Sequence, residues 1–153
     1  MKKLFVVIIT LTLVVAGCSS QEDKKDRETE KNTNNTTKIV KNFLEHSYTE
    51  NDIKQWSEFD EYASKQLKNT VKNQKQTYDD NGITKEMEDI SLYKNSDNDK
   101  EYMYNIKVKK TDDNAKNIDY NQRYGIVKLK NEDGHIKVNN LKEVGSETYN
   151  GGD

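Results

Sequence analysis

Apolar side chains change their spacing along the 153-residue chain in a way that divides it into regions. An apolar run broken only by two threonines occupies residues 4–16, and no aliphatic or aromatic residue lies between Ser19 and Thr37. From Ile39 to Tyr78 apolar residues recur at three- and four-residue steps, which is typical of helices. After Gly82 they alternate with polar residues, which is typical of strands. The pattern predicts helices first and a sheet afterwards.

Two helices are expected in the first half of the domain. Ile39, Val40, Phe43 and Leu44 form the apolar stripe of one helix, for which Thr36 or Thr37 is a suitable N-cap. A longer helix is predicted over residues 57–78, because residues 57–60 have the form of a capping box. The Asn-Gly pair at 81–82 is a typical helix stop.

Four short strands are expected after Gly82, at residues 90–92, 102–108, 124–129 and 136–138, with a hairpin turn at 131–134. In the third strand Tyr124 and Ile126 share one face while Val127 and Leu129 share the other. Either both faces are covered there or a bulge near Gly125 shifts the alternation, and we favour the bulge. The predicted fold class is α+β, with N-terminal helices packed on a curved four-stranded antiparallel meander.

The first residues have the layout of a secretory signal peptide: Lys2 and Lys3, the apolar run, then small residues. The run is shorter than the roughly 20 residues that span a bilayer as a helix. Val15-Ala16-Gly17-Cys18 resembles the lipobox of bacterial lipoproteins. The resemblance implies cleavage between Gly17 and Cys18 and acylation of the Cys18 thiol. The expected location is the extracytoplasmic face of the cell membrane, with acyl chains on Cys18 as the anchor.

These observations predict four segments. Residues 1–17 are the signal peptide, residues 18–37 a lipidated disordered tether, residues 38–147 a single α+β domain, and residues 148–153 a flexible tail. The tether is predicted because its composition offers nothing to bury.

Charge and polarity limit the partners. The formal net charge is −2, and it becomes −4 once the two lysines of the signal peptide are removed. An acidic chain with scattered lysines offers no clustered basic face, so no nucleic-acid partner is expected. Mean hydropathy is −1.14. We nevertheless expect a folded domain, because the apolar residues are aromatic or β-branched and regularly spaced.

The chain offers little chemistry for catalysis. Cys18 is the single cysteine, and His46 and His135 are the only histidines. Two histidines are too few for a typical zinc site, and we expect both at the surface. There is no phosphate-binding glycine loop, GxSxG elbow or HExxH pair. We therefore expect a protein that is not an enzyme, with no catalytic residues, metal or cofactor.

Nine tyrosines are the unusual feature of the composition. Tyr102 and Tyr104 alternate with polar residues in the most regular strand, and we favour a core position for both. Tyr120 and Tyr124 are left open between a core position and contact with a partner, because tyrosine is a frequent anchor in protein interfaces.

The lipobox, the polar tether and the order of helices before four strands together resemble small cystatin-like or nuclear-transport-factor-like lipoproteins of Gram-positive bacteria. Some of these are encoded in conjugation operons, and the resemblance implies a cone-shaped domain over residues 38–147. The favoured function is a non-catalytic binding subunit of a cell-envelope assembly, in conjugative transfer or a related mobile-element system. The expected partners are the membrane, through lipid on Cys18, and an envelope protein.

Two alternatives stay open. One is a surface inhibitor or immunity lipoprotein that binds a hydrolase, a bacteriocin or a phage factor. The other is a small-ligand binder that uses the hollow of the cone. The sequence leaves the oligomeric state undetermined.

Overall fold

The computed structural model describes the backbone of residues 22–74, 82–112 and 117–151, and the side chains of the first helix from residue 35 onward. The chain divides into two compact units, Met1–Asn32 and Thr33–Asp153. The second unit holds the sheet, the shorter helices and the buried core. It begins at Thr33 and not at the predicted residue 38.

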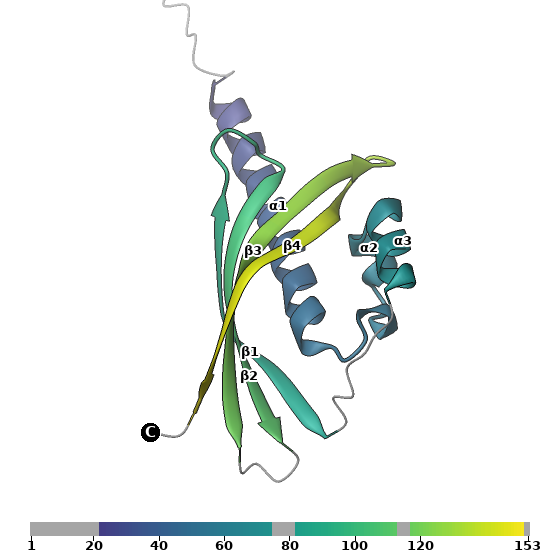
Figure 1. Ribbon diagram of the computed structural model, residues 1–153. Coiled ribbons are helices and arrows are strands. Elements are labelled where there is room, and N and C mark those ends of the chain that lie inside the picture. Colours follow the sequence, from purple (N-terminus) through teal and green to yellow (C-terminus); the bar gives the residue numbers. More distant parts are fainter. Residues whose placement is uncertain (1–21, 75–81, 113–116, 152–153) are drawn as a thin grey trace, which may run out of the picture. The chain divides into compact units, whose positions relative to one another are not determined.

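Four antiparallel strands follow one another in a single twisted sheet (Figure 1). They are β1 (Ile83–Lys94), β2 (Glu101–Asp112), β3 (Ile118–Glu132) and β4 (His135–Asn150). Each strand pairs with the next one in the sequence, so the spatial order is β1-β2-β3-β4. This confirms the α+β class and the four-stranded antiparallel meander.

The turn between β3 and β4 lies where the sequence predicts it. Asp133 and Gly134 have φ angles of 55° and 82°, and two left-handed residues in succession are typical of the tight hairpin turn that matches strand twist. At its other end β4 is longer than predicted, because Tyr149 pairs with Tyr120 and Asn150 with Asp119. The expectation of a flexible tail from residue 148 is therefore wrong as far as Asn150.

The first helix, α1 (Glu22–Thr49), carries the predicted apolar stripe, with Val40, Phe43 and Leu44 fully buried. It begins at Glu22, so the expectation of a disordered tether is wrong for residues 22–37. Glutamate, lysine and arginine are good helix formers, and extending an existing helix fixes only one residue for each added hydrogen bond. Thr36 and Thr37 consequently lie inside the helix and are not N-caps.

The long helix predicted over residues 57–78 is interrupted. The structure has a 3₁₀ helix η1 (Ile53–Gln55), then α2 (Phe59–Tyr62) and α3 (Lys65–Asn73), and α3 ends before the Asn-Gly pair. The break occurs because Ala63 forms a parallel bridge with Val138, and the Ser64 amide donates to the Val138 carbonyl at 2.9 Å. The Ser64 hydroxyl then accepts from the Leu67 amide and starts α3. The predicted capping box does not form, since Glu58 precedes α2 without a side-chain cap.

The core lies on the inner face of the sheet, which carries every second residue of β2. Tyr102 and Tyr104 are 1% and 2% exposed, so the prediction of core positions for both is confirmed. The other buried apolar members of this cluster come from the helices and from β2, β3 and β4: Val40, Phe43, Leu44, Trp56, Phe59, Ala63, Leu67, Ile106, Val108, Val127, Leu129 and Val138.

The irregularity predicted near Gly125 exists, but it lies in the neighbouring strand. Pairing of β2 with β3 is continuous, whereas β4 has a register shift opposite Tyr124 and Gly125 that leaves Val144 as the extra residue. Alternation in β3 is therefore unbroken, with Val127 and Leu129 inside. A Cβ atom on Gly125 would overlap the Tyr104 hydroxyl and the Lys142 carbonyl, so glycine is required by the size of the core tyrosine.

We predict that Gly125→Ala lowers the free energy of unfolding by about 1–3 kcal/mol, the usual cost of overpacking. Gly145→Ala is the matched control, because a Cβ there meets the Tyr124 ring at an ordinary 3.8 Å, and a change within about 0.5 kcal/mol is expected. Urea unfolding followed by circular dichroism measures both. Equal stabilities of the two variants would contradict the packing argument.

Candidate functional site

The predicted lipidation site Cys18 and the predicted cleavage position after Gly17 lie outside the described residues, so both stay predictions. Within the described residues, no helix combines the length and the apolar character needed to cross a bilayer.

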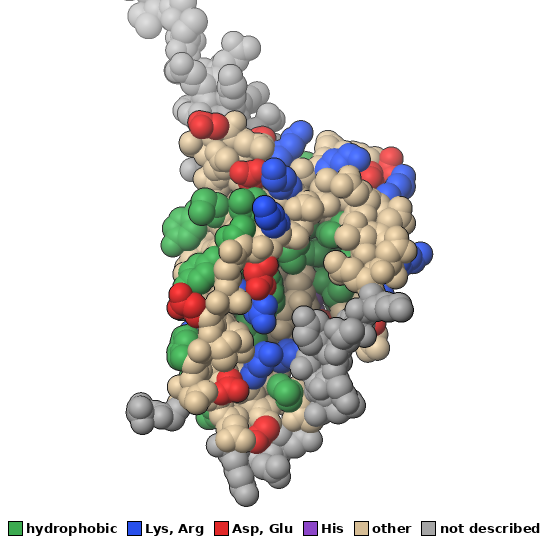
Figure 2. Space-filling model, viewed as in Figure 1, with side chains coloured by type: hydrophobic (Ala, Val, Ile, Leu, Met, Phe, Trp, Pro, Cys, Tyr) green, Lys and Arg blue, Asp and Glu red, His purple; other side chains and the backbone are tan. Residues whose placement is uncertain are grey.

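The outer face of the sheet carries apolar side chains that are not part of the core. The strand register places Tyr93, Met103 and Ile126 directly beside one another across β1, β2 and β3. Tyr93 is 61% exposed and Met103 is 59% exposed, although both lie in regular strands. Figure 2 shows hydrophobic side chains grouped along one margin of the molecule, over the strands. We call Tyr93, Met103 and Ile126 the outer row.

Tyr124 extends the outer row along β3, whereas Tyr120 is occupied by other contacts. Tyr124 pairs with Gly145, and its ring lies 3.8 Å from the position of a Cβ on that glycine. Tyr120 stacks on Tyr149 with ring centroids 5.6 Å apart, and the Lys107 ammonium lies 4.1 Å from its centroid. The structure therefore places both predicted contact residues on the outward face and leaves Tyr124 as the better candidate for a partner.

Cross-strand ion pairs lie on the same face as the outer row. Lys107 pairs with Glu88 at 3.2 Å, and Lys128 pairs with Glu101 at 3.1 Å. An exposed apolar patch with polar groups around it is typical of an interaction surface. Tyrosine and methionine are also enriched in interface centres, where charged groups are depleted. The arrangement is suited to binding a protein.

The inner face holds a polar network that joins α1 to three strands. The hydroxyls of Tyr48 and Tyr104 lie 2.7 Å apart, Tyr48 donates to Glu143 at 3.2 Å, and Arg123 donates to Glu143 at 2.8 Å. Burial, and then the hydrogen bond with Tyr104, raises the pKa of Tyr48 well above 10.0. Burial also raises the pKa of Tyr104. Beside this network a hollow of about 260 Å³ is lined by Tyr48, Asn121 and Arg123, so the small-ligand alternative stays a prediction.

The two histidines have different surroundings. His135 is exposed at the start of β4, as expected. His46 is half-buried, accepts or donates a 3.1 Å hydrogen bond with Glu50, and stacks on Trp56 at 4.2 Å. In the described part of the chain, no three His, Cys, Asp or Glu side chains are grouped as a metal site would require.

Sequence reasoning identified Tyr124 but missed the outer row. The signal was present, because Met103 and Ile126 occupy strand positions whose neighbours on both sides face the core. The network of Tyr48, Arg123 and Glu143 had no such signal, since its members are distant in sequence and meet only in the fold.

In comparisons with known proteins, no family model and no curated protein matches this chain.

We predict that the stability difference between the wild type and Tyr48→Phe shrinks above about pH 10. Tyr48 has a raised pKa in the folded state, so its contribution is fully present below the unfolded pKa and is lost as pH rises, when the unfolded chain ionises first. The difference in free energy of unfolding between the two proteins then falls by at most about 1.4 kcal/mol per pH unit. Urea unfolding across this range measures the difference.

The exposed Tyr93 provides the control, and Tyr93→Phe is expected to follow the wild type at every pH. Parallel pH profiles of the wild type and Tyr48→Phe would mean that the hydroxyl network does not disfavour ionisation of Tyr48.

Proposed function

We propose that this chain is an extracytoplasmic lipoprotein that acts as a non-catalytic binding subunit of a cell-envelope assembly, through the outer face of its sheet. The observation that carries the proposal is the outer row, in which Tyr93 and Met103 stay more than half exposed in regular strands. The lipobox-like residues before Cys18 supply the membrane anchor in this proposal.

The chemistry of the outer row favours a folded protein as the partner. Its side chains form a continuous row, because directly paired residues on neighbouring strands point to the same side. Tyrosine gives a large contact area at low entropic cost, and Ile126 and Tyr124 widen the patch. The neighbouring ion pairs provide a polar rim that orients the partner.

The biological setting is proposed from the resemblance. The order of a helical region before a four-stranded meander resembles the cone-shaped, cystatin-like or nuclear-transport-factor-like lipoproteins, some of which are encoded in conjugation operons. This supports an assembly for conjugative transfer or a related mobile-element system.

The first prediction from this proposal concerns the anchor. Growing bacteria that are given labelled palmitate should incorporate the label into the wild-type chain and not into Cys18→Ala, because the thiol is the acylated atom. Gel electrophoresis of the purified chain measures the label. Label in both proteins, or in neither, would remove the membrane placement.

The second prediction concerns the outer row. A photoreactive amino acid at position 103 should form an adduct with an envelope protein in intact cells, and the same group at the exposed Gln66 of α3 should not. Met103→Glu should reduce co-purification of that partner by about tenfold or more, the effect of a charge placed in an interface centre. Gln66→Glu adds the same charge elsewhere and is the matched control.

The identity of the adduct separates the candidate functions. An integral membrane protein supports the assembly subunit, whereas a secreted hydrolase or bacteriocin would favour the inhibitor alternative. Equal adducts from positions 103 and 66, or none from position 103, would exclude the outer row as the binding surface.

A further inference from the structure

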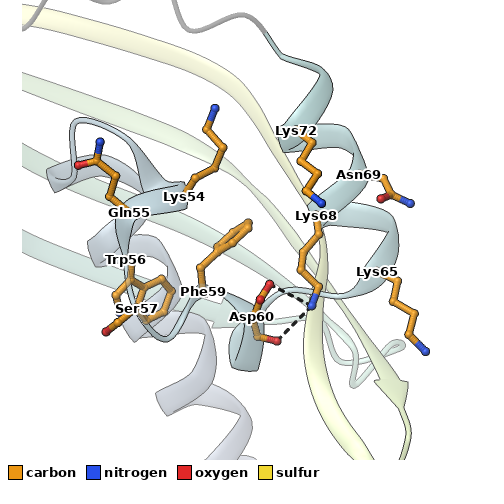
Figure 3. A pocket seen from close by; sticks show the side chains of 10 residues that line it. All are labelled: Lys54, Gln55, Trp56, Ser57, Phe59, Asp60, Lys65, Lys68, Asn69 and Lys72. Atoms are coloured by element: carbon orange, nitrogen blue, oxygen red, sulfur yellow. Dashed lines mark hydrogen bonds and ion pairs between the residues drawn. The ribbon is translucent and has the colours of Figure 1, made fainter.

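A second feature of the domain lies among its helices and is chemically unlike the outer row. A hollow of about 650 Å³ opens between η1 and the pair α2 and α3. Lys54, Lys65, Lys68 and Lys72 line it, together with the rings of Trp56 and Phe59 (Figure 3). We call it the lysine hollow. Its size lies within the range of small-molecule sites.

Three of the four lysines come from one helix. Lys65, Lys68 and Lys72 are three and four residues apart on α3 and therefore share one side of the helix. Leu67 is buried and Val71 is partly buried against the core, so the opposite side of α3 packs inward. In Figure 3, Lys54 comes from the η1 side and Phe59 points into the space between it and the α3 lysines.

Positive charge in the lysine hollow is only partly neutralised. Asp60 is the one carboxylate in the lining, and it lies 3.1 Å from the Lys68 ammonium. Lys65 pairs with Asp133 at 3.3 Å, but both side chains are mostly exposed and such pairs contribute little. Lys72 has no ion-pair partner among the described residues. Lys54 pairs with Asp52 at 3.6 Å. Three of the four lysines therefore have an ion-pair partner, and of these partners Asp60 alone belongs to the lining.

The floor of the lysine hollow is rigid and apolar. Trp56 and Phe59 are both buried members of the core. Trp56 is held between His46, with ring centroids 4.2 Å apart, and Tyr62, at 4.8 Å. The amides of Gln55 and Asn69 add neutral hydrogen-bonding groups to the lining.

We propose that the lysine hollow binds a multiply charged anion that carries phosphate groups. Lysine binds phosphate as a point charge, and several ammonium groups around one space attract an anion that bears several charges in a small volume. The phosphate belongs either to a soluble compound or to the headgroup of an anionic lipid. The site uses residues of the folded domain alone and does not depend on the lipid on Cys18.

Trp56 makes the test local, because it is the only tryptophan in the chain. The full chain in a nonionic detergent is titrated with pyrophosphate and with tripolyphosphate while tryptophan fluorescence is recorded. Sodium chloride at equal ionic strength is the reference. We expect a saturable change with a midpoint below about 1 mM, the weak limit of specific binding, and a lower midpoint for tripolyphosphate.

Variants of equal charge locate the binding. The double substitution Lys54→Gln and Lys72→Gln should weaken binding by about tenfold, since each screened surface contact contributes a factor of a few. The double substitution Lys100→Gln and Lys142→Gln removes the same charge at exposed positions outside the hollow and should leave the midpoint unchanged. If the first double variant does not fold, Lys72→Gln alone carries the test, with about threefold weakening expected.

Two further arms separate the sources of the phosphate. Mixed micelles that contain phosphatidylglycerol should change Trp56 fluorescence if a lipid headgroup is the ligand, and micelles with phosphatidylcholine should not. A response to the soluble phosphates alone indicates a soluble ligand. No response to any phosphate probe, or equal midpoints in the wild type and the Lys54 and Lys72 variants, would overturn the proposal. The outer-row experiments remain independent of either result.

Discussion

The fold depends on how two tyrosines are accommodated in a core whose other members are aliphatic, phenylalanine and tryptophan side chains. Tyr102 and Tyr104 place their rings on the inner face of β2, where an unpaired hydroxyl would cost about 1–3 kcal/mol. Both hydroxyls find partners on α1: Thr36 lies 2.7 Å from that of Tyr102, and Tyr48 lies 2.7 Å from that of Tyr104. No buried side-chain nitrogen or oxygen is left without a partner in the described part of the chain. Two polar contacts therefore fix residues 36–48 against the sheet, in addition to apolar packing, and Gly125 provides the space that the second ring needs.

The same alternation that fills the core also creates the outer surface. Residues of β2 and β3 that lie between core positions must point outward, and in most of them a charged or amide side chain meets the solvent. Met103 and Ile126 depart from this, and the strand register brings them beside Tyr93 of β1. Because α1 and the core already occupy the inner face, the outer face is the side of the sheet on which a partner would add buried apolar area.

The outer row and the lysine hollow share no residue and differ in chemistry. The first is aromatic and apolar with paired charges around it, and the second is a group of lysines beside the rings of Trp56 and Phe59. Under the two proposals, one molecule would hold a protein partner on its sheet and a phosphate-bearing anion among its helices. The helical segment of residues 53–73 lines the lysine hollow. The bridge between Ala63 and Val138 ends α2, and the Ser64 hydroxyl then caps the start of α3.

Local patterning was sufficient to predict the order of helices before four strands, the hairpin at Asp133 and Gly134, and the burial of Tyr102 and Tyr104, because each depends on residues close together in the chain. It left Tyr120 and Tyr124 open between a core position and partner contact, and only the strand register places both on the outward face. Local patterning failed for features that depend on contacts between segments distant in the sequence. The helix is interrupted at Ser64 because the Ser64 amide donates to the Val138 carbonyl. The last residues of β4 are in a strand because they pair with the first residues of β3, and the bulge opposite Gly125 lies in β4, which pairs with the strand that contains this glycine. Helix extension to Glu22 was missed for a different reason, since apolar spacing says nothing about polar residues with good helix propensity. The outer row and the lysine hollow exist only after folding, because their side chains come from strands and helices that the sequence separates and that register and packing bring together.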